Sequence, residues 1–196
     1  MTPLYQRLLG PAWQSLAPPI QQLHTVSSVS RFAGRCRVVR GQNLLARLVA
    51  ALVGFPEASA DQPIEVTLTV QGSTELWVRS FSGRAFSSRQ WADGDGAAPG
   101  DLLRERFGVV CVGLALAVEN ANLRYMVRNW SFCGMPMPRW LGPRSIATES
   151  VEAGQFKFDV QISHPLTGLI VRYAGLLAPT AAPTDELSAP ASAPSG

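Results

Sequence analysis

Lysine is nearly absent from this chain, and the residues that most often build metal and catalytic centres are also scarce. Lys157 is the only lysine among 17 basic residues, and the 196 residues include two histidines. His24 and His164 lie far apart with no cysteine or histidine at ligand spacing, so the sequence predicts no metal site and no cofactor. Lys157 and Asp159 share the polar face of an expected strand, where a solvated amine is more common than a Schiff-base lysine.

Cysteine is also scarce, and no long apolar run is present. Cys36, Cys111 and Cys133 are odd in number and widely spaced, which argues against a disulfide framework and is typical of a reducing cytosol. The first residues lack the basic start and apolar centre of a secretory signal. The longest helical apolar run, 44–55, is interrupted by Arg47 and is shorter than the roughly 20 residues of a membrane-spanning helix. We therefore expect a cytoplasmic protein without a transmembrane segment.

Motifs of common enzyme and nucleic-acid-binding classes are missing. The sequence has no G-x-S-x-G elbow and no glycine-rich dinucleotide fingerprint. Basic residues are not interleaved with aromatic ones, so no nucleic-acid partner is expected. These observations favour a protein that is not an enzyme, although they leave catalysis open.

Basic residues are concentrated at the start of the chain. Six arginines precede the first acidic residue, Glu57, and the whole chain has a formal net charge of +3. Such a segment can bind an anionic lipid headgroup, a nucleic acid or an acidic partner. The alternative, which we favour, is that these arginines pair within the fold with later acids such as Glu65 or Glu119.

What the sequence does contain is a long series of strand patterns. From Phe156 to Ile162 apolar residues alternate with polar ones, and a turn at 164–168 leads to an almost wholly apolar strand, which predicts an antiparallel hairpin. Short connections between successive strands favour a meander. We predict a β-dominated α+β fold in which about 8–9 antiparallel strands curl into a barrel or a strongly bent sheet. The other strands are expected at 32–40, 64–70, 74–81, 84–91, 109–118, 123–132 and 145–152.

Helices are expected mainly before the first strand, at 3–10 and 14–24, with a further short one at 102–107. At 44–53 a longer helix is predicted, because Asn43 can cap its start while Gly54 and Pro56 end it. This helix is apolar nearly all round, so we predict that it is buried and covers one opening or one face of the sheet. An interfacial helix needs a broad charged face, so we also expect no stable membrane attachment.

The chain is expected to form one domain, 1–178. Within it, the segment 93–100 predicts a flexible loop, and the segment 135–143, with three prolines, predicts a rigid loop or lid. The segment 179–196 is rich in alanine, proline and serine and lacks aromatic residues, which predicts a disordered tail.

Several phrases, taken in order, resemble one bacterial family. They include LYxRLLGPAW near the start, ARLVAxLxGFP at 46–56, ELWVRSFxG at 75–83, PMPRWLxP at 136–143 and PLTGLIVRYAGxL at 165–177. Over about residues 3–178 the chain is similar to the family called domain of unknown function 4166. Members of that family occur alone or fused to saccharopine-dehydrogenase-like or short-chain-type NAD(P)-binding domains. The resemblance therefore implies an accessory or docking domain for a separate NAD(P)-dependent oxidoreductase.

The strongest candidate site is the interior of the curved sheet. On two strands, at 77–81 and at 128–130, arginine alternates with large aromatic residues. Aromatic walls with a few fixed arginines are typical of a cavity for a small hydrophobic anion, such as a fatty-acyl or isoprenoid-like molecule. The alternative is a plain core in which these arginines reach solvent or pair with Glu75, Glu105 or Glu149. The candidate ligand-binding residues, including two from the lid and one acid, are Trp77, Arg79, Phe81, Arg128, Trp130, Arg139, Trp140 and Glu149.

A third hypothesis, beside ligand binding and docking to an oxidoreductase, is catalysis. Glu149, Asp159 or His164 would have to act as an acid or base in the same pocket as Arg79 or Arg128. An outer position for all three would remove this hypothesis.

Overall fold

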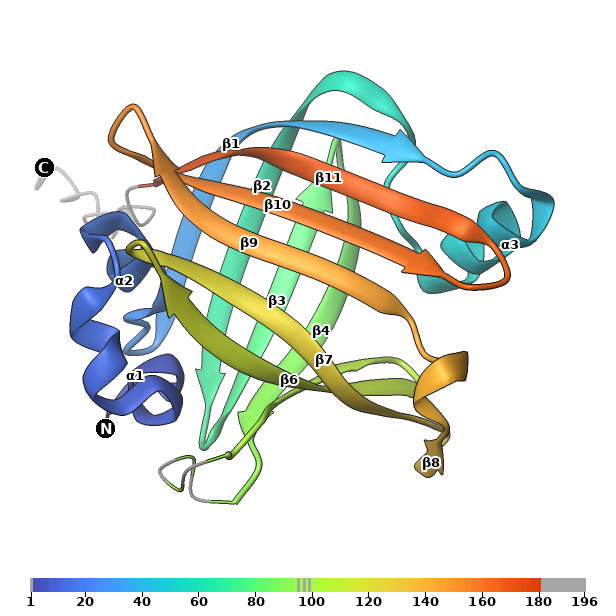
Figure 1. Ribbon diagram of the computed structural model, residues 1–196. Helices are drawn as coiled ribbons and strands as arrows, with labels where there is room; N and C mark the ends of the chain where they lie inside the picture. Colours follow the sequence, from blue (N-terminus) through green and yellow to red (C-terminus); the bar gives the residue numbers. More distant parts are fainter. Residues whose placement is uncertain (1, 95, 97, 99, 181–196) are drawn as a thin grey trace, which may run out of the picture.

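Ten antiparallel strands close into a barrel in the computed structural model, which describes residues 2–94, 96, 98 and 100–180 (Figure 1). The strand order is β6-β5-β4-β3-β2-β1-β11-β10-β9-β7, a second pairing of β6 with β7 closes the ring, and the short β8 extends β7 at its edge. The strands are β1 (Val29–Arg40), β2 (Ser59–Gln71), β3 (Thr74–Phe81), β4 (Arg84–Ala92), β5 (Leu103–Phe107), β6 (Val110–Glu119), β7 (Asn122–Phe132), β8 (Met135–Met137), β9 (Arg144–Glu152), β10 (Gln155–His164) and β11 (Gly168–Pro179).

The alternating sequence pattern sets the inner and outer faces of the wall. In β2, Val66 and Leu68 are buried while Glu65 and Thr67 point outward, as period-two alternation requires. In β10, Phe156 and Phe158 are buried, and β10 pairs with β11 along its whole length. The predicted β-dominated fold, with a meander curled into a barrel, is therefore confirmed, although the number of strands is larger than expected.

Two segments differ from the sequence-based expectation. The segment expected as a helix at 102–107 is strand β5, which pairs with β4 and β6 and buries Leu103 and Glu105 at alternate positions. So short a segment is compatible with both the helical and the strand periodicity. It forms a strand because its backbone N–H and C=O groups pair with those of β4 and β6. The 135–143 loop contains β8, in which Pro136 stands opposite Ser131 of β7. Proline is tolerated there because β8 lies at the edge of the sheet, where no further strand needs an N–H donor.

One end of the barrel, here called the floor, is covered by the helices α1 (Leu4–Leu9), η1 (Gly10–Ser15) and α2 (Pro18–His24). Tyr5, Ile20 and Leu23 of these helices have at most 1% of their surface exposed. Burial of each aliphatic side chain stabilises the fold by about 1.5–3 kcal/mol. The floor is thus a firmly packed closure of the barrel.

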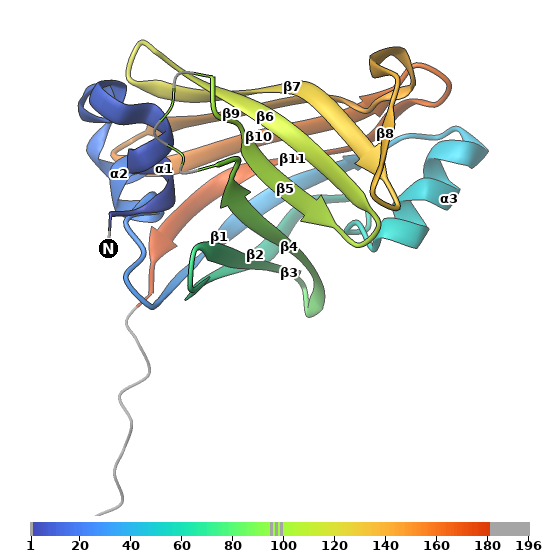
Figure 2. The same cartoon turned by 90° about the horizontal axis from the view of Figure 1, so that it is seen from below.

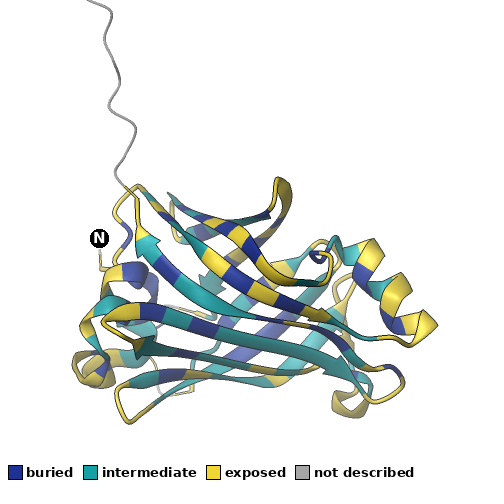
Figure 3. Ribbon diagram, turned by 90° about the horizontal axis from the view of Figure 1, so that it is seen from above, coloured by how far each residue is buried: buried dark blue, intermediate teal, exposed yellow. Residues whose placement is uncertain are grey.

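The opposite end, here called the mouth, is partly covered by helix α3 (Leu44–Val53) (Figure 2). Asn43 caps its start by accepting a hydrogen bond from the Leu45 N–H at 2.9 Å, and Gly54 ends it in a left-handed conformation. The predicted burial of this helix is wrong. Ala46 and Ala50 are its buried residues, and most of its surface is exposed in Figure 3.

The exposed face of α3 has a simple geometric cause. The helix lies across the rim and packs on β11 rather than against the face of the sheet, so only a narrow stripe of small residues touches the barrel. Leucines fill the outer face, with exposed fractions of 79% for Leu44, 45% for Leu45, 55% for Leu48 and 78% for Leu52. Apolar composition therefore does not place this helix in the core.

Two further expectations concern segments that are described in part. The predicted flexible loop 93–100 includes residues 95, 97 and 99, which lie outside the described residues, as does the predicted tail beyond residue 180. Strand β11 itself continues to Pro179. No helix in the described part of the chain is long and apolar enough to cross a membrane.

Candidate functional site

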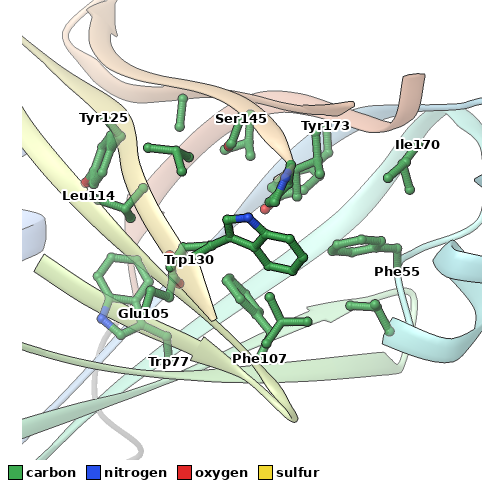
Figure 4. Close-up of a pocket in the computed structure, with 18 of the residues that line it drawn as sticks. Phe55, Trp77, Glu105, Phe107, Leu114, Tyr125, Trp130, Ser145, Ile170 and Tyr173 are labelled. Atoms are coloured by element: carbon green, nitrogen blue, oxygen red, sulfur yellow. The ribbon is translucent and has the colours of Figure 1, made fainter. Parts of the chain in front are cut away.

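A cavity of about 270 Å³ lies inside the barrel between the floor and the mouth (Figure 4). Its two ends differ in chemistry. Tyr125, Glu105 and Trp77 lie on the side away from α3, while Phe55 and Ile170 lie beside it. The cavity is therefore polar toward the floor and apolar toward the mouth. Its volume is close to the lower end of the range for small-molecule pockets, about 300–1,000 Å³.

The first polar group in the cavity is an ion pair between Arg79 of β3 and Glu105 of β5, at 3.3 Å. Glu105 Oε1 also accepts hydrogen bonds from the Ser88 hydroxyl at 2.7 Å and from Gln90 Nε2 at 3.0 Å. Arg79 donates a second bond to Ser88 and lies 4.9 Å from the centre of the Trp77 ring. Glu105 is thus well supplied with donors. The hydrogen bonds of Arg79 to described residues use two of the five guanidinium N–H groups.

The second polar group joins the floor helices to the barrel wall. Glu149 of β9 contacts His24 Nε2 at 2.6 Å through one oxygen and accepts from the Tyr125 hydroxyl at 2.7 Å through the other. Tyr5 stacks on the His24 ring at 3.6 Å between centroids and donates to Gln90 Oε1 at 2.8 Å. His24 is fully buried and its Nδ1 has no hydrogen-bond partner among the described residues.

Burial fixes the protonation of the tyrosines around these groups. Desolvation, followed by the charge of Glu149, holds the pKa values of Tyr5 and Tyr125 well above the usual range. Burial likewise raises the pKa of Tyr173 to about 12. Burial alone would lower the pKa of Arg79, but Glu105 and the neighbouring tyrosines raise it on balance. At neutral pH the cavity thus contains neutral hydroxyl groups and a charged guanidinium.

The apolar end of the cavity is formed where several elements meet at the mouth. Val49 and Val53 of α3 contribute, and the short helix η2 (Arg139–Leu141) contributes Leu141. His164 Nε2 donates to the Leu141 carbonyl oxygen at 2.8 Å, because its Nδ1 accepts from the Leu166 N–H. The β10–β11 turn therefore holds η2 in place at the rim.

The structure brings together some of the sequence-predicted site residues. Trp77, Arg79, Trp130 and Glu149 line the cavity. Phe81 is buried in the adjacent core, where its ring packs against those of Phe86 and Tyr173.

The other predicted residues lie elsewhere. Arg128 and Arg139 are exposed and line a groove on the outside of the wall, and Trp140 is 72% exposed. The expectation that Arg128 and Trp130 lie on the same face of their strand is wrong, because Arg128 is the extra residue of a β-bulge. Gly113 stands opposite Asn129 and Leu114 opposite Val127, so the alternation restarts at this point.

Tyr5 and Tyr125 are cavity residues that the sequence did not reveal. Glu105 was expected only in the alternative of a plain core, as an ion-pair partner of the arginines, and it does pair with Arg79. The bulge at Arg128 also conceals Tyr125, because uninterrupted alternation along 123–132 would place Tyr125 on the face opposite to Trp130. Glu105 lies in the strand expected as a helix. Tyr5 belongs to α1, and no local sequence pattern predicts that this helix covers the floor of the barrel.

The candidate acids and bases divide between the two sides of the wall. Glu149 and His164 line the cavity together with Arg79. Asp159 forms a bidentate pair with Arg172 on the outer face, with distances of 2.9 and 2.6 Å, and Lys157 pairs with Glu152.

Comparison with known proteins adds a family. No curated protein matches the chain. The sequence model of the family described as domain of unknown function (DUF4166) matches residues 16–177, which cover the floor helix α2 and the barrel strands β1 to β11 almost to their end. The chain belongs to the DUF4166 family.

Proposed function

We propose that this protein binds a small hydrophobic anion, such as a fatty acid, inside the barrel. The observation that supports this proposal is the polarity gradient of the cavity, with Arg79 and its unused N–H groups at one end and Phe55, Ile170 and Leu141 at the other. The head of such a molecule would accept hydrogen bonds from Arg79, and its chain would lie toward the mouth.

The hydrogen-bond inventory favours an acceptor as the head group. The Tyr5 hydroxyl already donates to Gln90, the Tyr125 hydroxyl to Glu149, and Gln90 Nε2 to Glu105. Arg79 is the charged donor with capacity left, and a buried guanidinium gains most from an acceptor that is itself charged. A carboxylate or phosphate meets this requirement better than a hydroxyl group does.

Decanoic acid tests the proposal directly, with decanol as a ligand of the same chain length and a neutral head. We expect calorimetric binding of decanoate to be stronger than that of decanol. Arg79→Gln should weaken decanoate binding roughly 10–100-fold, the loss of one charged hydrogen bond, while the outer-face control Arg172→Gln should leave it unchanged. Ala147→Phe, which fills part of the cavity from strand β9, should weaken both ligands.

Native mass spectrometry of the purified protein gives an independent measurement. A co-purified lipid-like molecule that is lost in Ala147→Phe would support the proposal. Absence of any such molecule, together with no binding of decanoate or decanol, would overturn it.

Catalysis is a second candidate function because Glu149 lines the cavity and is held by His24 and Tyr125. In that case Glu149 would act as a proton acceptor toward the bound molecule. Chemical conversion of the co-purified molecule by the wild type, and its persistence in Glu149→Gln, would support this candidate, whereas equal persistence in both would remove it. Docking to a separate NAD(P)-dependent oxidoreductase stays a prediction from the family resemblance.

A further inference from the structure

The mouth of the barrel exposes an unusual amount of apolar surface. Nine of the twelve large apolar side chains that are exposed among the described residues belong to α3, to η2, to the turns around the rim or to the strand ends beside those turns. We call this set the apolar collar. Its members are Leu44, Leu45, Leu48, Leu52, Val109, Phe132, Met135, Trp140 and Leu166.

Direct contacts show that these segments share one end of the barrel. The Cys133 N–H donates to the Val109 carbonyl oxygen at 2.9 Å, which joins the β7–β8 turn to the β5–β6 turn. His164 joins the β10–β11 turn to η2, and α3 packs on β11. Figures 1 and 2 place α3, β8 and the β10–β11 turn at the same end. The collar therefore surrounds the apolar end of the cavity.

The charge of the mouth has one predominant sign. The segments 41–58, 107–110, 132–146 and 163–168 contain Arg47, Arg139 and Arg144, and their only acid is Glu57. The charge of Glu57 is already satisfied by Arg40 at 2.7 Å and Arg84 at 2.8 Å, and hydrogen bonds from Arg40 and then Arg84 lower its pKa. Arg47, Arg139 and Arg144 are exposed and form no ion pair with a described residue.

We propose that the mouth docks on an anionic lipid membrane. Exposed leucines, a tryptophan and a phenylalanine insert between lipids at the headgroup level, and the arginines bind the anionic headgroups. This combination of apolar collar and unpaired arginines is complementary to a bilayer surface. The proposal departs from the expectation of no stable membrane attachment, because that expectation depended on a buried α3. The entry of a ligand from that membrane through the mouth rests in addition on the proposed binding function.

Vesicle flotation at physiological salt tests the docking. We expect the full chain to float with vesicles of phosphatidylcholine and phosphatidylserine, and to float much less with phosphatidylcholine alone. Each arginine near an anionic surface strengthens binding about fivefold, so replacing Arg47, Arg139 and Arg144 with glutamine should weaken binding on the order of 100-fold. The matched control replaces the exposed Arg31, Arg89 and Arg124, which lie toward the floor ends of β1, β4 and β7, and should bind like the wild type.

The apolar part of the docking surface has its own variant. Leu48→Glu with Leu52→Glu changes the exposed face of α3 and should abolish flotation, while Val29→Glu, an exposed position outside the mouth, should not. Circular dichroism and the thermal unfolding midpoint verify that both variants fold. Equal flotation of the leucine double variant and the wild type would overturn the proposal. So would a stable dimer in sedimentation experiments that depends on the same leucines and binds no vesicles.

Decanoate binding separates this proposal from the proposed function. Loss of flotation in mouth variants that still bind decanoate from solution would confirm that the two properties use different residues. A wild type that binds decanoate but no vesicles would overturn the docking alone. A wild type that binds vesicles but no decanoate would leave the docking intact and overturn the ligand.

Discussion

The floor and the mouth of the barrel are both covered by short helices, yet they place polar and apolar side chains in opposite ways. At the floor, Tyr5 and His24 are fully buried and are connected to Glu149 and Gln90 on the wall. At the mouth, Leu44 and Leu52 are largely exposed to solvent. Buried polar groups and exposed apolar groups both cost free energy unless something compensates them. At the floor, hydrogen bonds provide this compensation. At the mouth, no described residue covers the exposed leucines, as the proposed membrane docking requires.

Leucine-to-alanine substitutions should separate the two ends most strongly. Leu23 of α2 is 1% exposed and Leu52 of α3 is 78% exposed. Leu23→Ala should lower the free energy of unfolding by about 2–5 kcal/mol, because it removes packed methyl groups and leaves a cavity. Leu52→Ala should change it by less than about 0.5 kcal/mol. Urea unfolding measures both values, and similar losses for the two would contradict the comparison.

The pH dependence of stability should reveal a buried acid at the floor. Burial raises the pKa of Glu75, against smaller opposing effects of His24 and of a hydrogen bond from Trp77. Its neutral form is therefore favoured in the folded state, so its contribution to stability is present below the unfolded pKa and is lost as pH rises through the folded pKa. Glu75→Gln, which cannot ionise, should gain stability relative to the wild type as pH rises from 4 to 7.

An exposed acid provides the control of opposite sign. A hydrogen bond from Arg35 lowers the pKa of Asp61, so its contribution is present above the unfolded pKa and is lost as pH falls. Asp61→Asn should therefore lose stability relative to the wild type as pH rises from about 2 to about 4, the range that ends near the pKa of a free aspartate. Denaturant midpoints at several pH values measure both trends. Parallel trends for the two variants would show that Glu75 is not held in a desolvating site.

Thiol labelling should give the smallest effect but the simplest one. Cys133 lies exposed in the β7–β8 turn at the mouth, whereas Cys36 is buried in the wall. Burial raises the pKa of Cys36 to about 11, which keeps it protonated and unreactive. Labelling with a thiol reagent at pH 8 should modify Cys133 first, and Cys133→Ser should remove this fast phase. A fast phase that persists in Cys133→Ser but disappears in Cys36→Ser would contradict the assignment.

Local sequence patterns predicted the wall of the barrel well. Alternation is a property of neighbouring residues, so Val66, Leu68, Phe156 and Phe158 could be assigned to the interior without knowledge of the rest. The same rule failed at Arg128, because one inserted residue reverses the alternation and nothing in the sequence marks it. As a result the arginine was assigned to the cavity while Tyr125 was left out.

Positions that depend on distant partners could not be predicted. Helix α3 has the composition of a core helix, and only its place across the rim exposes its leucines. His24 and Tyr5 gain their roles from Glu149 and Gln90, which lie on strands far along the chain. The inner position of Arg79 could be predicted because its local alternation and its aromatic neighbours both agree with it.

The connections of the floor have a consequence for how the chain folds. Tyr5 and Gln90 are separated by 85 positions, and His24 and Glu149 by 125. The segment before β1 can therefore reach its final place only after β4 and β9 have joined the barrel. Contacts of such long sequence separation slow folding, because the loop entropy is lost before the contacts stabilise the structure. The floor helices should thus dock late, and an intermediate with an assembled wall and both ends open should come before the native protein.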